Sequence, residues 1–216
     1  ELSRPEESLA GRIAIGSGDF RAGAVLFDAL ADFQKHYPLV KIEVFSGNTD
    51  SIKEKIEQGT LDLGLVMEPF DVTRYNFLHL PVKERWCAYV KADHPLAGKA
   101  HVTPKDLKNE QLLTTVRPIV ANLIENWFAS SGITPNIVAT GNLLYNIASM
   151  VRSGIGVSLN LDLESEYDGI VKVPLRPGIE SSTVLVWKKS DVHTATTAAF
   201  IEHLQKYIDS INKDKK

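Results

Sequence analysis

Three short strand patterns separated by two helical patterns occupy the first third of the chain, and this alternation restricts the fold more than any other feature. Residues 12–16 and 41–45 contain alternating apolar side chains, and residues 61–66 form an almost uninterrupted apolar run. Such a run is typical of a strand that is buried on both faces. Strand, helix, strand, helix and strand fit within roughly 55 residues. The pattern therefore predicts an α/β fold with a parallel sheet.

Apolar side chains at helical spacing occupy the two segments between these strands. Leu26, Leu30 and Phe33 lie four and three positions apart, which places them on one face of a helix. Pro38 ends this helix because proline cannot continue one, and Gly59 ends the second helix. Further strand patterns cover residues 86–91, 111–115, 136–140, 156–159, 170–175 and 182–187, and further helical patterns cover residues 120–128, 143–151 and 194–211.

Composition excludes several classes of protein. The formal net charge is −3 over 216 residues, and the scattered basic side chains form no dense stripe for nucleic acid. No apolar run reaches the roughly 18–20 residues that span a bilayer, so we expect no membrane partner. The single cysteine, Cys87, lies in an apolar stretch and cannot form an internal disulfide. It is typical of a buried thiol in a reducing compartment, and we expect a cytoplasmic protein.

Small polar residues follow each of the first three strands. The loops read Gly16-Ser17-Gly18-Asp19, Gly47-Asn48-Thr49 and Met67-Glu68-Pro69. Because ligands of open α/β sheets bind beyond the carboxyl ends of the strands, these loops predict a site for a small polar molecule. The alternative is that Ser17 or Asp19 only caps the first helix, as Asn48 or Thr49 would cap the second.

Motifs for nucleotides, metals and catalysis do not occur in the chain. A G-x-G-x-x-G fingerprint would need a glycine where Arg21 stands, and no phosphate-loop Gly-Lys-Ser/Thr is present. The six histidines lie in no H-E-x-x-H motif, and there is no G-x-S-x-G elbow. The carboxylate pairs lie in polar stretches typical of solvated surface. We therefore expect no metal, no cofactor and no catalytic group, and hence no enzyme.

An ordered series of motifs resembles the effector-binding domain of LysR-type transcriptional regulators. The early motifs are Gly11-Arg12-Ile13-Ala14-Ile15-Gly16, Phe33-Gln34-Lys35-His36-Tyr37-Pro38, Lys41-Ile42-Glu43-Val44 and Gln58-Gly59-Thr60-Leu61-Asp62-Leu63-Gly64-Leu65. The later motifs are His94-Pro95-Leu96-Ala97 and Val151-Arg152-Ser153-Gly154-Ile155-Gly156-Val157. The resemblance covers nearly all of residues 11–212. It departs at Ser158-Leu159-Asn160-Leu161, where many members have an apolar pair and a proline.

The resemblance implies a periplasmic-binding-protein-like fold of type II, with two Rossmann-like lobes joined by two crossover strands. Lobe I would comprise residues 11–82 plus 186–212 and lobe II residues 83–185, with residues 1–10 as the remnant of a linker and residues 213–216 as a tail. A small effector would bind in the cleft between the lobes. In the whole regulator, a winged helix-turn-helix N-terminal to this domain would bind DNA, and the protein would form a homodimer or homotetramer.

Carried over residue by residue, the resemblance assigns the effector site to loops of both lobes. The expected contacts are Ser17, Gly18, Asp19, Phe20, Asn48, Thr49, Met67 and Glu68 in lobe I, and Thr115, Val116 and Asn142 in lobe II. Family pockets often bind carboxylates, whereas here Asp19 and Glu68 add negative charge. Two alternatives use the same scaffold. A solute-binding protein of a transporter would have a precursor with a signal peptide, and an enzyme would need an acid–base pair in the cleft.

Overall fold

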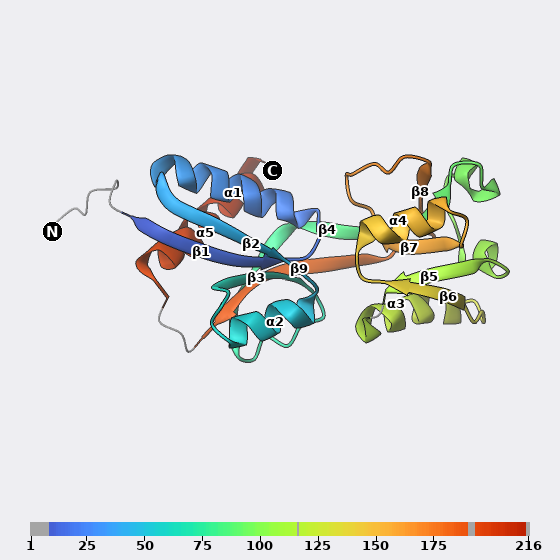
Figure 1. The fold of residues 1–216 in the computed structure, drawn as a ribbon, viewed down its shortest axis with the longest axis horizontal. Coiled ribbons are helices and arrows are strands. Elements are labelled where there is room, and N and C mark those ends of the chain that lie inside the picture. Colours follow the sequence, from blue (N-terminus) through green and yellow to red (C-terminus); the bar gives the residue numbers. More distant parts are fainter. Residues whose placement is uncertain (1–8, 116, 190–192, 215–216) are drawn as a thin grey trace. The chain divides into compact units, whose positions relative to one another are not determined.

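The chain folds into two compact units, which are drawn in Figure 1. The computed structural model describes residues 9–115, 117–189 and 193–214. Unit 1 comprises Glu1–Lys83 and Ser181–Lys216, and unit 2 comprises Glu84–Glu180. Strands β4 (Tyr75–Lys91) and β9 (Glu180–Lys188) carry the chain from one unit into the other. The sequence suggested a return at residue 186, but Ser182 and Thr183 already bond with unit 1, which places the return at Ser181.

Unit 1 is built on a sheet whose strand order is β2-β1-β3-β9. The first three strands along the chain are β1 (Ala10–Ser17), β2 (Leu39–Ser46) and β3 (Leu63–Met67). β1 pairs in parallel with both β2 and β3, and β9 pairs antiparallel with β3. The parallel sheet predicted for the first third of the chain is thereby confirmed.

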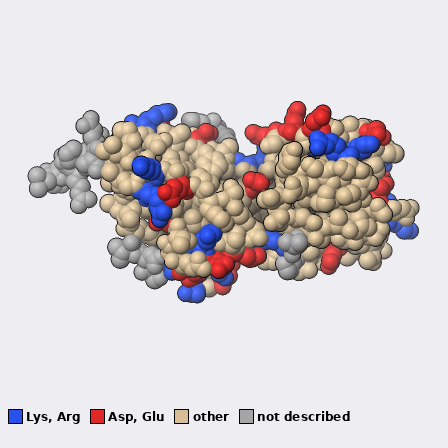
Figure 2. Space-filling view, viewed as in Figure 1, with Lys and Arg blue, Asp and Glu red and all other residues tan. Residues whose placement is uncertain are grey.

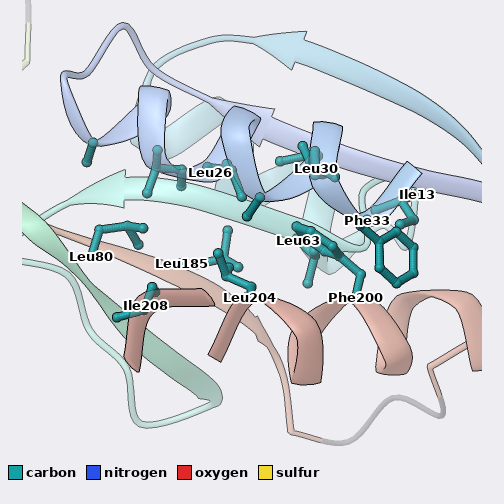
Figure 3. Packing of buried hydrophobic residues seen from close by; sticks show 14 of the residues in the cluster. Ile13, Leu26, Leu30, Phe33, Leu63, Leu80, Leu185, Phe200, Leu204 and Ile208 are labelled. Atoms are coloured by element: carbon teal, nitrogen blue, oxygen red, sulfur yellow. The ribbon is translucent and has the colours of Figure 1, made fainter. Parts of the chain in front are cut away.

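Helices cover both faces of this sheet. α1 (Ala22–His36) and α5 (Ala195–Asp214) pack on one face, where their side chains and those of the sheet form one apolar cluster (Figure 3). The Phe33 ring of α1 meets the Phe200 ring of α5 edge-on, with 5.4 Å between the ring centroids. α5 continues to Asp214, so residues 213 and 214 of the predicted tail are helical, because helical hydrogen bonding persists past the last apolar residue; residues 215–216 lie outside the described residues.

The opposite face of the unit 1 sheet carries α2 (Thr49–Glu57). Ile52 and Ile56 of this helix are buried against the sheet. The buried Tyr75 hydroxyl donates a hydrogen bond to Glu57 and lowers the pKa of that carboxyl. Burial, together with the same hydrogen bond, raises the pKa of Tyr75 above its ordinary value.

Unit 2 has a second sheet, with strand order β4-β7-β5-β6. Its strands are β5 (Gln111–Thr115), β6 (Asn136–Gly141), β7 (Val157–Leu161) and β8 (Ile170–Pro174), which pairs with β4 beside the main path. β5 is parallel to both β6 and β7, and β4 is antiparallel to both β7 and β8. The helices of this unit are η2 (Pro95–Gly98), η3 (Pro104–Leu107), α3 (Pro118–Ala129) and α4 (Leu144–Arg152).

The core of unit 2 lies against both faces of its sheet. Leu113 and Val151 pack together on the face that α4 covers. Cys87 belongs to the same cluster, is 2% exposed, and has its pKa raised by burial, so the prediction of a buried thiol is confirmed. On the α3 side, the Trp127 indole N–H donates to the Pro177 carbonyl at 2.7 Å.

The surface is mixed in charge. On the face shown in Figure 2, lysines and arginines are interspersed with aspartates and glutamates over a mostly uncharged surface. Among the helices of the described residues, none is long and apolar enough to cross a membrane.

Candidate functional site

The carboxyl ends of three parallel strands form one edge of unit 1. β1 ends at Ser17, β2 at Ser46 and β3 at Met67. The Gly47 N–H donates to the Ser17 carbonyl at 3.1 Å, which joins the first two loops. The loops that the sequence singled out therefore start from the same edge of the sheet.

In the first loop, the Ser17 hydroxyl proton is engaged in a hydrogen bond within the loop. Ser17 is 4% exposed, and its Oγ donates to the Gly18 carbonyl at 2.7 Å, so the oxygen keeps only its capacity to accept. The N-cap of α1 is Arg21 and makes no side-chain cap hydrogen bond, so the prediction that Ser17 or Asp19 caps this helix is wrong. A Cβ on Gly18 would lie 2.6 Å from the Phe20 ring, so glycine allows Phe20 to fold over the loop.

In the second loop, Asn48 caps α2 and Thr49 does not. Asn48 is the N-cap of α2, and its Oδ1 accepts the Ser51 N–H at 2.9 Å. Thr49 is therefore not the cap. It is 5% exposed, and its Oγ1 has no hydrogen-bond partner in the described structure. A buried hydroxyl left in this state has donor and acceptor capacity available to a ligand.

The third loop contacts β9, a strand from near the end of the chain, at the same edge of the sheet. Met67 is 5% exposed and pairs with Thr183 of β9. The Glu68 N–H donates to the Ser182 carbonyl at 2.9 Å, and a Glu68 carboxylate oxygen lies 3.9 Å from His79 Nδ1. Thr183 is fully buried, and its Oγ1 is without a partner among the described residues. Sequence reasoning missed Thr183, and the only signal was a threonine directly before a run of buried apolar residues.

The corresponding edge of unit 2 carries polar residues at the ends of β5 and β6. Thr115 ends β5 and is half-buried, and its Oγ1 accepts the Arg117 N–H at 3.4 Å. Asn142 is exposed and directly precedes Leu143, the N-cap of α4. Val116 lies outside the described residues. Thr114 was not predicted; it is 6% exposed, and its buried Oγ1 is unpartnered within the described part of unit 2.

The chemistry of the two edges suits recognition of a polar molecule. Each edge has a buried threonine hydroxyl that has no partner among the described residues, and each has hydroxyl or amide oxygens that can accept a hydrogen bond. Over residues 9–115, 117–189 and 193–214, no group of three or more His, Cys, Asp or Glu side chains is placed to hold a metal ion.

Comparison with known proteins identifies related chains. The family model of the LysR substrate binding domain matches residues 6–209. The HTH-type transcriptional regulator MetR of Escherichia coli K12 is 31% identical over 183 residues, which are 82% of this chain and 56% of MetR. The chain spans between 56% and 66% of the length of three curated relatives that it matches.

Solved structures have the same fold. HinK, a LysR family transcriptional regulator from Pseudomonas aeruginosa, is 26% identical with a TM-score of 0.76, over 94% of this chain and 71% of HinK. The effector binding domain of QuiR in complex with shikimate has a TM-score of 0.83 at 19% identity, over 94% of this chain and 99% of that domain. At that identity the likeness to QuiR concerns the fold alone.

Proposed function

Since the chain belongs to the LysR substrate binding domain family, we propose that it senses a small molecule for a bacterial LysR-type transcription regulator. Its fold is the periplasmic-binding-protein-like fold of type II. In this proposal a helix-turn-helix elsewhere in the whole protein binds DNA in the cytoplasm, and the effector controls that binding. The names of MetR and HinK, both transcriptional regulators, support the proposal.

The family also bears on the two alternatives left open by the sequence, a solute-binding protein and an enzyme. A solute-binding protein of a transporter shares the scaffold, but the family match and the regulator relatives favour a regulator. We further propose that the chain recognises its effector without transforming it, since these relatives are named as transcriptional regulators. A homodimer or homotetramer is the proposed assembly of the whole protein.

One observation carries the proposed site: the buried Thr49 hydroxyl at the N-terminus of α2 has no partner in the described structure. Leaving a buried hydroxyl unpaired costs about 1–3 kcal/mol. A ligand that hydrogen-bonds this hydroxyl would recover that free energy. Ser17 is the second proposed contact, because its oxygen accepts while its proton is held by Gly18.

The remaining predicted residues have distinct proposed roles. Gly18 and Phe20 would shape the first loop, Asn48 would hold α2 in place, and Met67 would line the site with its apolar side chain. Asp19 and Glu68 would favour an effector that carries donors. In unit 2 we propose Thr115 and Asn142 as contacts, and Val116 remains a prediction from the sequence alone.

Effector binding would act on an equilibrium between two states of the whole regulator. A ligand can shift such an equilibrium only by its difference in affinity for the two states. Coupling free energies of about 1–3 kcal/mol are typical, and they would be read out as altered DNA binding.

A thermal-shift screen of the purified chain tests the proposal. The panel would contain amino acids, organic acids including shikimate and benzoate, sugars and nucleotides. Ligand at about 100 times its Kd stabilises the folded state by roughly 2.7 kcal/mol, a readable shift in Tm. We expect hits within one chemical class and about tenfold weaker binding of those hits by Thr49→Val.

Thr49→Ser is the matched control, because it keeps the hydroxyl and loses only a methyl group. It should bind the hits nearly as well as the wild-type chain. Equal affinities of the wild type and Thr49→Val would remove Thr49 from the site. A panel without any hit would count against small-molecule sensing and favour control by a protein partner.

A further inference from the structure

Two side chains on β7 form a short hydrogen-bond relay that neither the fold nor the proposed contacts account for. Ser158 is fully buried, and its Oγ donates to the Leu113 carbonyl of β5 at 3.1 Å. The Asn160 side-chain amide donates in turn to Ser158 Oγ at 2.6 Å. The relay therefore runs from the end of β7 into the interior of the unit 2 sheet.

The Leu113 carbonyl determines which group donates and which accepts in each hydrogen bond of this relay. A backbone carbonyl can only accept, so the single Ser158 proton must point at Leu113. Ser158 Oγ can then only accept from Asn160, which must present its NH2 group inward. The Asn160 Oδ1 consequently points away from the relay, and among the described residues it accepts no hydrogen bond.

The Asn160 amide lies at the edge that carries the candidate site of unit 2. β5 and β7 are parallel, and Leu113 pairs with Ser158. Two positions further along the two strands come Thr115 and Asn160, on the same face of the sheet as that pair. Asn160 is half-buried, and its amide group is held in place by Ser158.

We propose that Asn160 is a specificity-determining residue, whose Oδ1 selects effectors that present a hydroxyl or amine donor. This inference rests on the proposed sensing function. An asparagine that could rotate freely would offer either a donor or an acceptor. The buried Ser158 removes that choice.

The experiment measures preference within matched pairs of compounds by isothermal titration calorimetry. Benzoate is compared with its three monohydroxy derivatives and with 4-aminobenzoate, and cyclohex-1-enecarboxylate is compared with shikimate. The wild-type chain should bind the best hydroxylated or aminated member about tenfold more tightly than its parent. Asn160→Leu should reduce this ratio to near one and leave affinity for the parent compound almost unchanged.

Two further variants separate recognition from structure. Ser158→Ala leaves Asn160 in place but frees its amide, so the ratio should fall partway. Asn126→Leu removes an exposed amide from α3 and should leave the ratio as in the wild type. Thermal unfolding of each variant establishes that it is folded at the titration temperature.

The outcomes distinguish this inference from the proposed function. Loss of donor preference in Asn160→Leu with retained binding of the parent compounds supports the role of Asn160. If compounds bind and depend on Thr49 but show no donor preference, or keep it in Asn160→Leu, the inference is wrong while the sensing function stands. If neither the parent compounds nor their hydroxylated or aminated derivatives bind, both the role of Asn160 and the sensing function are overturned for these classes of compound.

Discussion

Thr49, Thr114 and Thr183 each bury a hydroxyl that has no hydrogen-bond partner among the described residues. Natural proteins pair most buried polar atoms, so three unpaired threonines, one at the start of α2 and two within β5 and β9, indicate groups kept for something other than folding. Thr49 was expected from its place after a strand. Thr114 and Thr183 were not, because pairing of a hydroxyl depends on neighbours that only the tertiary structure brings together.

Replacing Thr183 by valine should stabilise the chain. Valine has nearly the same shape and removes the unpaired hydroxyl, so we expect the free energy of unfolding to rise by about 1 kcal/mol. Thr197 is the control, because it is equally buried but its hydroxyl is hydrogen-bonded to Thr194 at 3.0 Å. Thr197→Val should lose about 1 kcal/mol. Urea denaturation measures both, and a loss of stability in Thr183→Val would show that its hydroxyl is paired in solution.

Asn160 illustrates a second limit of sequence reasoning at the scale of single residues. The sequence marked residues 158–161 only as a departure from the family pattern. The direction of the Asn160 amide follows from Leu113, which lies far away in the sequence on another strand. Residue type alone leaves an asparagine undecided between donating and accepting, so this selectivity was not predictable.

Strands and helices were predicted well where apolar periodicity is strong, and poorly where a breaker interrupts it. The apolar run of residues 61–66, interrupted only by Asp62, overlaps β3 (Leu63–Met67), which is buried throughout. β4 begins at Tyr75, although only residues 86–91 were expected to be strand. Pro81 lies within β4, and a proline in an apolar run argues against a strand when only the sequence is read.

Close packing of β5 against the turn before β7 depends on Gly156. A Cβ at this position would lie 2.2 Å from the Gln111 carbonyl oxygen, a backbone atom that cannot move aside alone. Gly156→Ala should therefore cost more than about 2 kcal/mol and loosen the pairing of β5 with β7. Gly98→Ala is the control, since a Cβ there would meet nothing within 4 Å, and it should be nearly neutral. Equal urea midpoints for the two variants would contradict the predicted clash.

At the scale of the whole molecule, unit 2 is an uninterrupted stretch of chain inserted between the two segments of unit 1. The ends of those segments are close, because Lys83 donates a hydrogen bond from Nζ to the Ser182 hydroxyl. Unit 1 also has its own apolar cluster, which contains side chains from both segments.

Unit 1 should therefore fold without unit 2. Replacing residues 84–180 by a short glycine–serine turn should leave a protein with a cooperative thermal transition, because β9 can still pair with β3. Circular dichroism and calorimetry follow the transition. Phe200→Ala in the shortened protein is the control, and it should lower stability by about 3–5 kcal/mol if the same core has formed. A shortened chain that melts without cooperativity would show that unit 1 depends on unit 2.

Because unit 1 consists of two segments separated by unit 2, the order of synthesis determines which unit can fold first. The segment of unit 1 that ends at Lys83 emerges with one edge of β3 unpaired and the inner face of α1 uncovered, because β9 and α5 follow unit 2 along the chain. Unit 2 is complete before either of them is made. Unit 2 can thus fold first, while the earlier segment keeps leucines and phenylalanines exposed until β9 and α5 have been made. Nascent chains in this condition are natural clients for chaperones.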